Sequence, residues 1–125
     1  VFSAVPLPDD SVDAAVACSA FGTREARGGE CGLTELRRVT RSGGRIVIMW
    51  PEDPEWFIAR GFAYLILPGD LTITFPTLED ARQVAARFYG PEAMRYLDTT
   101  GRPELPFHIL GVKAPRDVCW LTVSK

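Results

Sequence analysis

One stretch constrains the fold of this chain more than any other: LTELRRVTRSGGRIVIMW, from Leu33 to Trp50. Apolar residues recur on one side of a helix predicted over residues 30–41. Arginines crowd its last turns, where cations oppose the negative end of the helix dipole. Gly43 suits the left-handed position that ends a helix. The apolar run that follows predicts a strand over residues 45–50, covered on both faces.

A second apolar run comes before this helix. VDAAVAC (Val12–Cys18) follows the turn PLPDD and shows little alternation, which again predicts a strand covered on both faces. Strand, helix and strand in that order form the βαβ unit of a parallel sheet. The chain is therefore predicted to be an α/β protein in which these two strands are adjacent and parallel.

Helix start signals recur in the second half of the chain. Asp53 and Pro54 suit the N-cap and first position of a helix whose body is expected over residues 55–67. Thr77, with an acid three residues later, opens a helix to about residue 89. The expected inner face of that helix consists of Ala81, Val84, Ala85 and Phe88.

The end of the chain is predicted to close the sheet. A shorter helix is expected from Pro91, and LPFHILGV and DVCWLTVSK then predict two strands separated by the turn KAPR. Repeats, low-complexity tracts and linkers are absent from the sequence. We therefore expect a single domain over residues 1–125.

Composition excludes several classes of function. A net charge of -2 with interleaved acids and bases predicts no nucleic-acid partner and no anionic membrane partner. No apolar run approaches the roughly 18 residues that a membrane helix needs. One histidine and 3 cysteines without CxxC spacing predict no metal site and a reducing, cytoplasmic location. The chain lacks a starting methionine, so we expect a processed, trimmed or partial chain.

Three segments resemble a known family. VPLPDDSVDAAVACSAF, LTELRRVTRSGGRIVIMWP and the C-terminal DVCWLTVSK are similar to the second half of class I S-adenosylmethionine-dependent methyltransferases, closest to the small-molecule group called type 11. The match is dense over residues 5–51, loose in the last twenty residues, and departs from the family at Ser42, where a proline is usual. The resemblance implies the C-terminal half of a Rossmann-like methyltransferase fold. Helices would cover the sheet faces, and residues 117–123 would form an antiparallel C-terminal strand beside residues 45–50, with the strand around His108 outside it.

The resemblance also implies that half of the fold lies outside this chain. In the family, the preceding strands carry a glycine-rich loop and an acid that binds ribose hydroxyls. The only glycine cluster before a helix here, GGECG at 28–32, is separated from its strand by a polar loop, and we interpret it as a plain loop. S-adenosylmethionine is thus the implied cofactor, with weak or no binding by this chain alone.

Several residues are candidates for the site by the same resemblance. Ser19, Ala20 and Phe21 follow the first predicted strand and would contact the cofactor; the alternative is that they merely finish the strand. Val1 and Phe2 stand where the family places residues near the adenine. The substrate-binding candidates are Trp50, Glu52, Trp56 and His108. A hydrogen-bonded structural role is the alternative for His108, as core packing is for the apolar segment 56–75. No catalytic residue can be named.

Two functions therefore remain open. The first is methyl transfer to a small-molecule acceptor, by an enzyme of which this chain is a part. The second is a non-catalytic α/β module for protein association. If the first strand of the family's sheet is absent, one edge of Val12–Cys18 has no partner, and unpaired edges are prone to association. We expect that edge to be covered by another copy of the chain, by a separate N-terminal half, or by a segment such as residues 1–7.

Overall fold

The computed structural model describes Phe2 and residues 4–125, which form two compact units. Unit 1 comprises residues up to Leu67 together with Arg116–Lys125, and unit 2 is Pro68–Pro115. The sequence shows no linker at these boundaries, yet each unit has a hydrophobic core of its own. The single domain expected over residues 1–125 stays a prediction.

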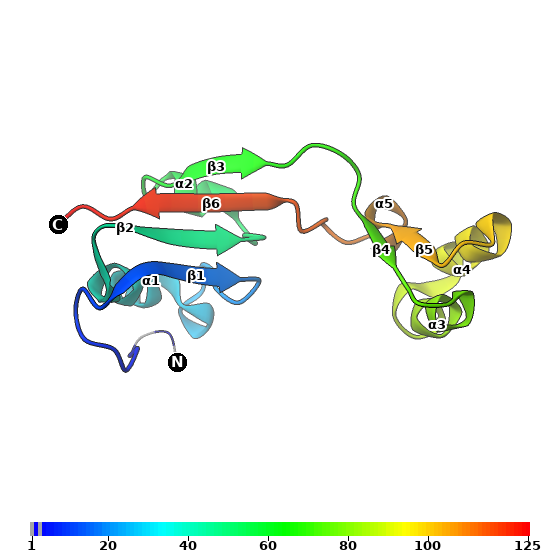
Figure 1. The fold of residues 1–125 in the computed structure, drawn as a ribbon, viewed down its shortest axis with the longest axis horizontal. Helices are drawn as coiled ribbons and strands as arrows, with labels where there is room; N and C mark the ends of the chain where they lie inside the picture. The colour runs from blue at the N-terminus through cyan, green and yellow to red at the C-terminus, as the bar shows by residue number, and fades with distance from the viewer. Residues whose placement is uncertain (1, 3) are drawn as a thin grey trace. The chain divides into compact units, whose positions relative to one another are not determined.

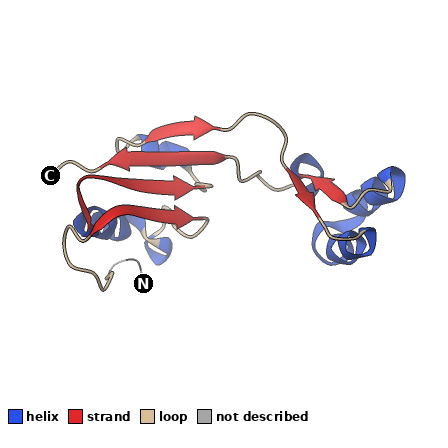
Figure 2. Cartoon of the chain, viewed as in Figure 1, coloured by secondary structure: helices blue, strands red, loops and turns tan. Residues whose placement is uncertain are grey.

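Unit 1 is built on a four-stranded sheet with the strand order β1-β2-β6-β3 (Figures 1 and 2). Its elements are β1 (Val12–Cys18), η1 (Glu25–Arg27), α1 (Gly29–Val39), β2 (Thr40–Met49), α2 (Pro54–Ile58), β3 (Ala63–Ile66) and β6 (Asp117–Thr122). Strands β1 and β2 are parallel, and β6 runs antiparallel to β2. The predicted parallel pair and the predicted antiparallel C-terminal strand are both confirmed.

The outer strand of this sheet is not the one expected. β3 pairs with β6, whereas the segment around His108 belongs to unit 2. The helix predicted over residues 55–67 is also wrong, because α2 ends at Ile58. Gly61 adopts a φ of 87° three residues later, a conformation that stops a helix. The apolar residues that follow are thereby free to extend along β6.

The junction between α1 and β2 differs from the prediction as well, since β2 begins directly after the helix. The helix ends at Val39, and the buried Thr40 is already extended. Gly43 therefore does not cap the helix; it takes a φ of 79° within β2, where the register with β1 shifts, and its N–H donates to the Val123 carbonyl over 2.8 Å. Gly44 is required for a different reason, since a Cβ there would lie 2.7 Å from the Asp13 carbonyl oxygen.

Both helices of unit 1 lie on the same face of the sheet (Figure 1). Leu33 of α1 and Phe57 of α2 pack on Ile46, Ile48 and Cys119. Alternation along a strand points the intervening residues to the opposite face. The predicted burial of β1 and β2 on both faces is therefore wrong for the described part of this unit.

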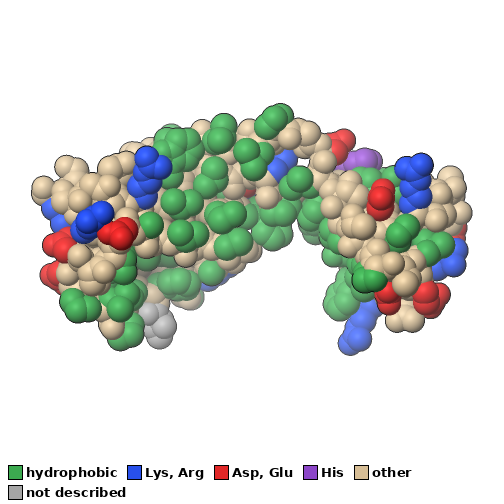
Figure 3. Space-filling view, in the orientation of Figure 1, with side chains coloured by type: hydrophobic (Ala, Val, Ile, Leu, Met, Phe, Trp, Pro, Cys, Tyr) green, Lys and Arg blue, Asp and Glu red, His purple; other side chains and the backbone are tan. Residues whose placement is uncertain are grey.

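The opposite face is apolar and exposed (Figure 3). The strand register aligns two rows of side chains across it: Val16, Val47, Trp120 and Ala63, then Cys18, Met49, Val118 and Leu65. Val16 is 63% exposed and Leu65 47%. At the edge of this face, β1 has β2 as its strand neighbour and no strand from the described residues on its other side.

Unit 2 packs helices against a two-stranded antiparallel sheet. Its elements are β4 (Thr72–Thr74), α3 (Leu78–Val84), the π-helical turn η2 (Ala85–Tyr89), α4 (Gly90–Thr100), β5 (Glu104–Pro106) and α5 (Phe107–Leu110). The predicted N-cap is confirmed: the Thr77 hydroxyl accepts from the Asp80 N–H over 3.0 Å. None of the helices that the structure describes is long and apolar enough to cross a membrane.

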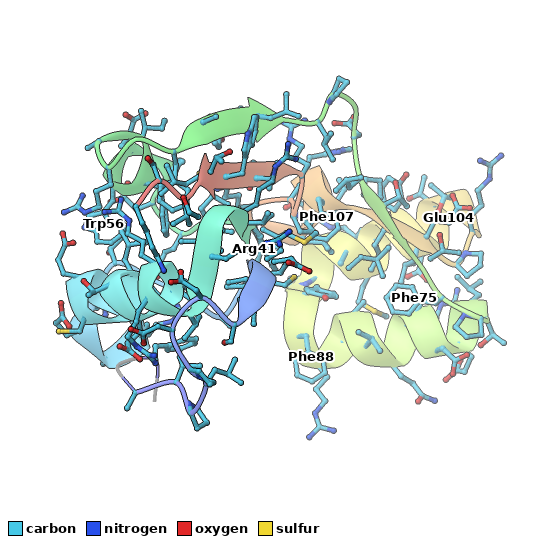
Figure 4. The ribbon with its side chains drawn as sticks, turned by 60° about the vertical axis from the view of Figure 1, so that its left-hand side comes forward. Arg41, Trp56, Phe75, Phe88, Glu104 and Phe107 are labelled. Atoms are coloured by element: carbon cyan, nitrogen blue, oxygen red, sulfur yellow. The ribbon has the colours of Figure 1, made fainter. Side chains whose placement is uncertain are left out.

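Two expectations for this unit are wrong. Phe88, placed on the inner face, is 68% exposed and projects away from its helix (Figure 4). The π-helical turn explains this, because its wider winding breaks the 3.6-residue period that the prediction assumed. His108 lies in the single turn α5 and not in a strand; the β5 strand ends two residues earlier.

Candidate functional site

The carboxyl ends of β1 and β2 lie side by side. Cys18 aligns with Met49 in the parallel register, and the Ser19 N–H donates to the Met49 carbonyl over 3.1 Å. One residue further on, the Trp50 N–H donates to the Asp117 carbonyl of β6 over 2.9 Å. The structure therefore brings the predicted residues Ser19 and Trp50 to one edge of the sheet, which we call the carboxyl edge.

Both of these residues have left-handed backbones. Ser19 has a φ of 51° and Trp50 a φ of 56°. Such values are uncommon for residues with a Cβ, and the proline after Trp50 favours an extended conformation at that position instead. Residues held in disfavoured regions cluster at functional sites. The carboxyl edge thus combines the sheet position typical of ligand binding with local backbone strain.

Arg27 joins this edge, although the sequence pattern did not point to it. Its guanidinium donates to the Glu52 carboxylate and to the Ser19 carbonyl, both over 3.1 Å. The Arg27 and Glu52 side chains are about half exposed, at 46% and 50%, so their ion pair adds little stability. Arg27 stands in a polar loop with a second arginine, and nothing in that loop singles it out.

Phe21 is a core residue in this structure. It is 2% exposed, and its ring centroid lies 5.5 Å from that of Phe2 and 6.0 Å from that of Phe57. A Cβ at Gly28 would lie 2.4 Å from the Phe21 ring, and one at Gly32 would lie 2.8 Å from it. Gly28 and Gly32 therefore make room for an aromatic ring. The interpretation of the GGECG cluster as a plain loop is wrong, because residues 29–32 form the first turn of α1.

Trp56 lies on α2 (Figure 4), and the side chain of Arg60 covers its ring. The Arg60 guanidinium sits 3.8 Å from the centroid of the indole, and the Trp56 ring meets that of Phe57 edge-on at 5.0 Å. Arg60 also pairs with Glu30, and this hydrogen bond lowers the pKa of the Glu30 carboxyl. The predicted N-cap of α2 is confirmed, since the Asp53 carboxylate accepts from the Trp56 N–H over 3.3 Å.

The remaining candidates fall into different places. Ala20 is exposed next to Ser19. His108 is exposed and belongs to unit 2, whereas the other substrate-binding candidates, Trp50, Glu52 and Trp56, belong to unit 1. Val1 lies outside the described residues. Its assignment to the cofactor site, and the roles assigned to the other candidates, stay predictions.

A partly buried pair next to the carboxyl edge was also missed. The Tyr64 hydroxyl of β3 donates to the Asp117 carboxylate over 2.9 Å, and Asp117 is 5% exposed. Burial and the hydrogen bond to Asp117 raise the pKa of Tyr64 to about 12. The sequence could not reveal this pair, because its two members are 53 residues apart and were assigned to a helix and a strand.

Two hollows lie away from the carboxyl edge. A groove of about 390 Å³ in unit 1 is lined by Arg37 and the last five residues of the chain. A shallow depression of about 360 Å³ in unit 2 is lined by residues of α4 and by Ile109. None of the predicted site residues lines either hollow.

Comparisons with known proteins assign no family. No protein-family model matches the chain, and no curated protein matches it. One solved structure with some similarity is that of the YcgJ protein from Bacillus subtilis, with 18% sequence identity and a TM-score of 0.41. That match covers 96% of this chain and 67% of the other. A likeness this weak carries no argument about function.

Proposed function

We propose that this chain is the C-terminal part of a class I S-adenosylmethionine-dependent methyltransferase that acts on a small-molecule acceptor. The resemblance over residues 5–51 is the first support. Its expectation of a parallel strand pair joined by a helix, with an antiparallel C-terminal strand beside the second member, agrees with the topology of unit 1. The proposal includes a cytoplasmic location, which 3 cysteines without CxxC spacing favour.

The observation that carries the proposal is the meeting of Ser19 and Trp50 at the carboxyl edge. In open α/β sheets, ligands bind outside the carboxyl ends of the strands. Two adjacent strands here end in strained residues at the same level. By the resemblance, Ser19 and Ala20 would face the cofactor, and Trp50 and Glu52 the acceptor.

The residues of this chain do not by themselves fit the cofactor. The Phe21 ring occupies the space beside Gly28 and Gly32. The Arg27 guanidinium already donates to the Ser19 carbonyl and to the Glu52 carboxylate. We therefore derive no catalytic step. In the complete enzyme the cofactor would carry the reactive methyl group, and the protein would supply alignment and exclusion of water.

A direct consequence is that the isolated chain should bind S-adenosylmethionine very weakly or not at all. Calorimetric titration of the chain measures this. A dissociation constant on the order of micromolar, about -8 kcal/mol, would show that the site is built in some other way.

The test of the enzyme itself needs the natural gene. Codons upstream of Val1 should encode a strand followed by a GxG-like loop, and the longer protein should bind S-adenosylmethionine. In that protein, Ala20→Trp should obstruct the carboxyl edge and weaken binding by about tenfold or more. Ser42→Trp is the matched control, since Ser42 is also exposed but lies near the amino end of β2, away from the carboxyl edge. Equal affinity in both variants would place the cofactor elsewhere.

A second function has an observation in its favour. The apolar rows across the sheet and the one-sided pairing of β1 suit a module that associates with another protein chain. The candidate partner is a second copy, paired through the edge of β1. Light scattering separates this function from the first if the complete, cofactor-binding protein proves to be a monomer.

A further inference from the structure

The backbone conformation of Trp50 is disfavoured for three reasons. Its φ of 56° is left-handed, its side chain is bulky, and it precedes Pro51. A backbone of this kind persists only where the surrounding structure imposes it. The question is which contacts of unit 1 impose it.

Asp117 provides the contact that reaches Trp50 directly. Its carbonyl oxygen accepts from the Trp50 N–H over 2.9 Å, and this bond extends the pairing of β2 with β6 by one residue. On the other side of Trp50, Pro51 is fully buried. The chain is thus held at the Trp50 N–H and again at Pro51, on either side of the left-handed Trp50 backbone.

Tyr64 in turn holds Asp117. Asp117 is the first residue of β6, where a strand end would ordinarily fray, yet it is 5% exposed. Its carboxylate accepts from the Tyr64 hydroxyl over 2.9 Å, and the register pairs Asp117 with Ile66 of the same neighbouring strand. Its side chain is therefore fixed by β3, while its backbone fixes Trp50.

We propose that Tyr64 and Asp117 form a clamp that keeps Trp50 left-handed and so positions the chain at the carboxyl edge. Without the Tyr64 hydroxyl, the start of β6 shifts, and Trp50 relaxes to a negative φ. The segment that carries Glu52 then leaves in another direction. The clamp concerns the backbone of this chain alone; only its role in positioning an acceptor rests on the proposed function.

Tyr64→Phe tests the clamp, with two readouts. The backbone ¹³C chemical shifts of residue 50, measured by NMR, should move from left-handed to negative-φ values. The second readout compares Trp50→Gly with Trp50→Ala, which differ only in the Cβ that the left-handed region disfavours. With Tyr64 present, the folding equilibrium constant of the glycine variant should be about 2–5-fold larger. In the Tyr64→Phe background that ratio should fall to one or below.

Two control variants separate the clamp from a general loss of stability. Tyr96→Phe removes a hydroxyl from α4 of unit 2 and should leave both readouts unchanged. Asp117→Asn keeps an oxygen that can accept from Tyr64 and should retain the left-handed shifts. The proposal is overturned if Tyr64→Phe leaves the shifts of residue 50 and the glycine-to-alanine ratio as they are in the wild type. Neither readout involves S-adenosylmethionine, so failure of the proposed function would not affect them.

Discussion

Replacing Trp50 by glycine and by alanine measures the strain at the carboxyl edge. Both changes remove the indole, so their difference isolates one Cβ atom at a φ of 56°. A Cβ in the left-handed region costs about 1–2 kcal/mol. Glycine also raises the conformational entropy of the unfolded chain, which offsets about 0.4–1 kcal/mol of the gain from removing that Cβ. We therefore expect Trp50→Gly to exceed Trp50→Ala in unfolding free energy by about 0.5–1 kcal/mol.

Ser42 is the matched control, because it is exposed and is not among the described residues with positive φ. Ser42→Gly should be less stable than Ser42→Ala by about 0.5–1 kcal/mol, so the order of the two variants reverses between the sites. Urea unfolding followed by tryptophan fluorescence provides the measurement. The 3 tryptophans of the chain all belong to unit 1, so this signal reports the unit that contains both sites.

The size of the effect is within reach of ordinary experiments. For a chain of this length, 1 kcal/mol moves the melting temperature by roughly 3–6 °C. If glycine and alanine rank in the same order at Trp50 and Ser42, the left-handed backbone of Trp50 carries no strain. The clamp would then have nothing to hold, and the functional reading of the carboxyl edge would lose its second support.

Three further predictions concern unit 1. The hydrogen bond from Arg38 holds the pKa of Glu35 below its ordinary value of about 4.5. The ionised Glu35 carboxylate therefore stabilises unit 1 fully above about pH 4.5, and this stabilisation is lost as the pH falls through the lowered pKa. Glu35→Gln should flatten the acid side of the curve of unfolding free energy against pH, and an unchanged curve would contradict the prediction. Tyr64, with a pKa of about 12, should stabilise unit 1 fully below about pH 10 and lose this effect as the pH rises towards 12. Tyr64→Phe should abolish the late step in tyrosinate absorbance during an alkaline titration. If that step remains in the variant, it belongs to another tyrosine. Val16→Lys should convert any dimer seen by light scattering to monomer; a dimer that persists would not use β1.

Local patterns in the sequence were enough to predict much of unit 1 and one helix start in unit 2. The strand β1 has the predicted bounds, and the caps at Asp53 and Thr77 form as expected. Glu35 and Arg38, three residues apart on α1, pair over 2.9 Å, although Arg38 also holds the preceding segment through Asp9. Each of these features depends on residues a few positions apart, where periodicity and side-chain chemistry act directly.

Tertiary structure decided the features that depend on distant partners. The segment with the sequence AYLI became a strand because β6 offered it an unpaired edge, and not because its own pattern excluded a helix. Phe21 lies in the core because the glycines at 28 and 32 leave space for its ring. For the candidate site, local patterns placed Ser19 directly after one strand and Trp50 at the end of the next. The meeting of Arg27 with Glu52, and of Tyr64 with Asp117, was decided by the folded sheet, because hydrogen bonds over such sequence separations exist only once the strands have paired.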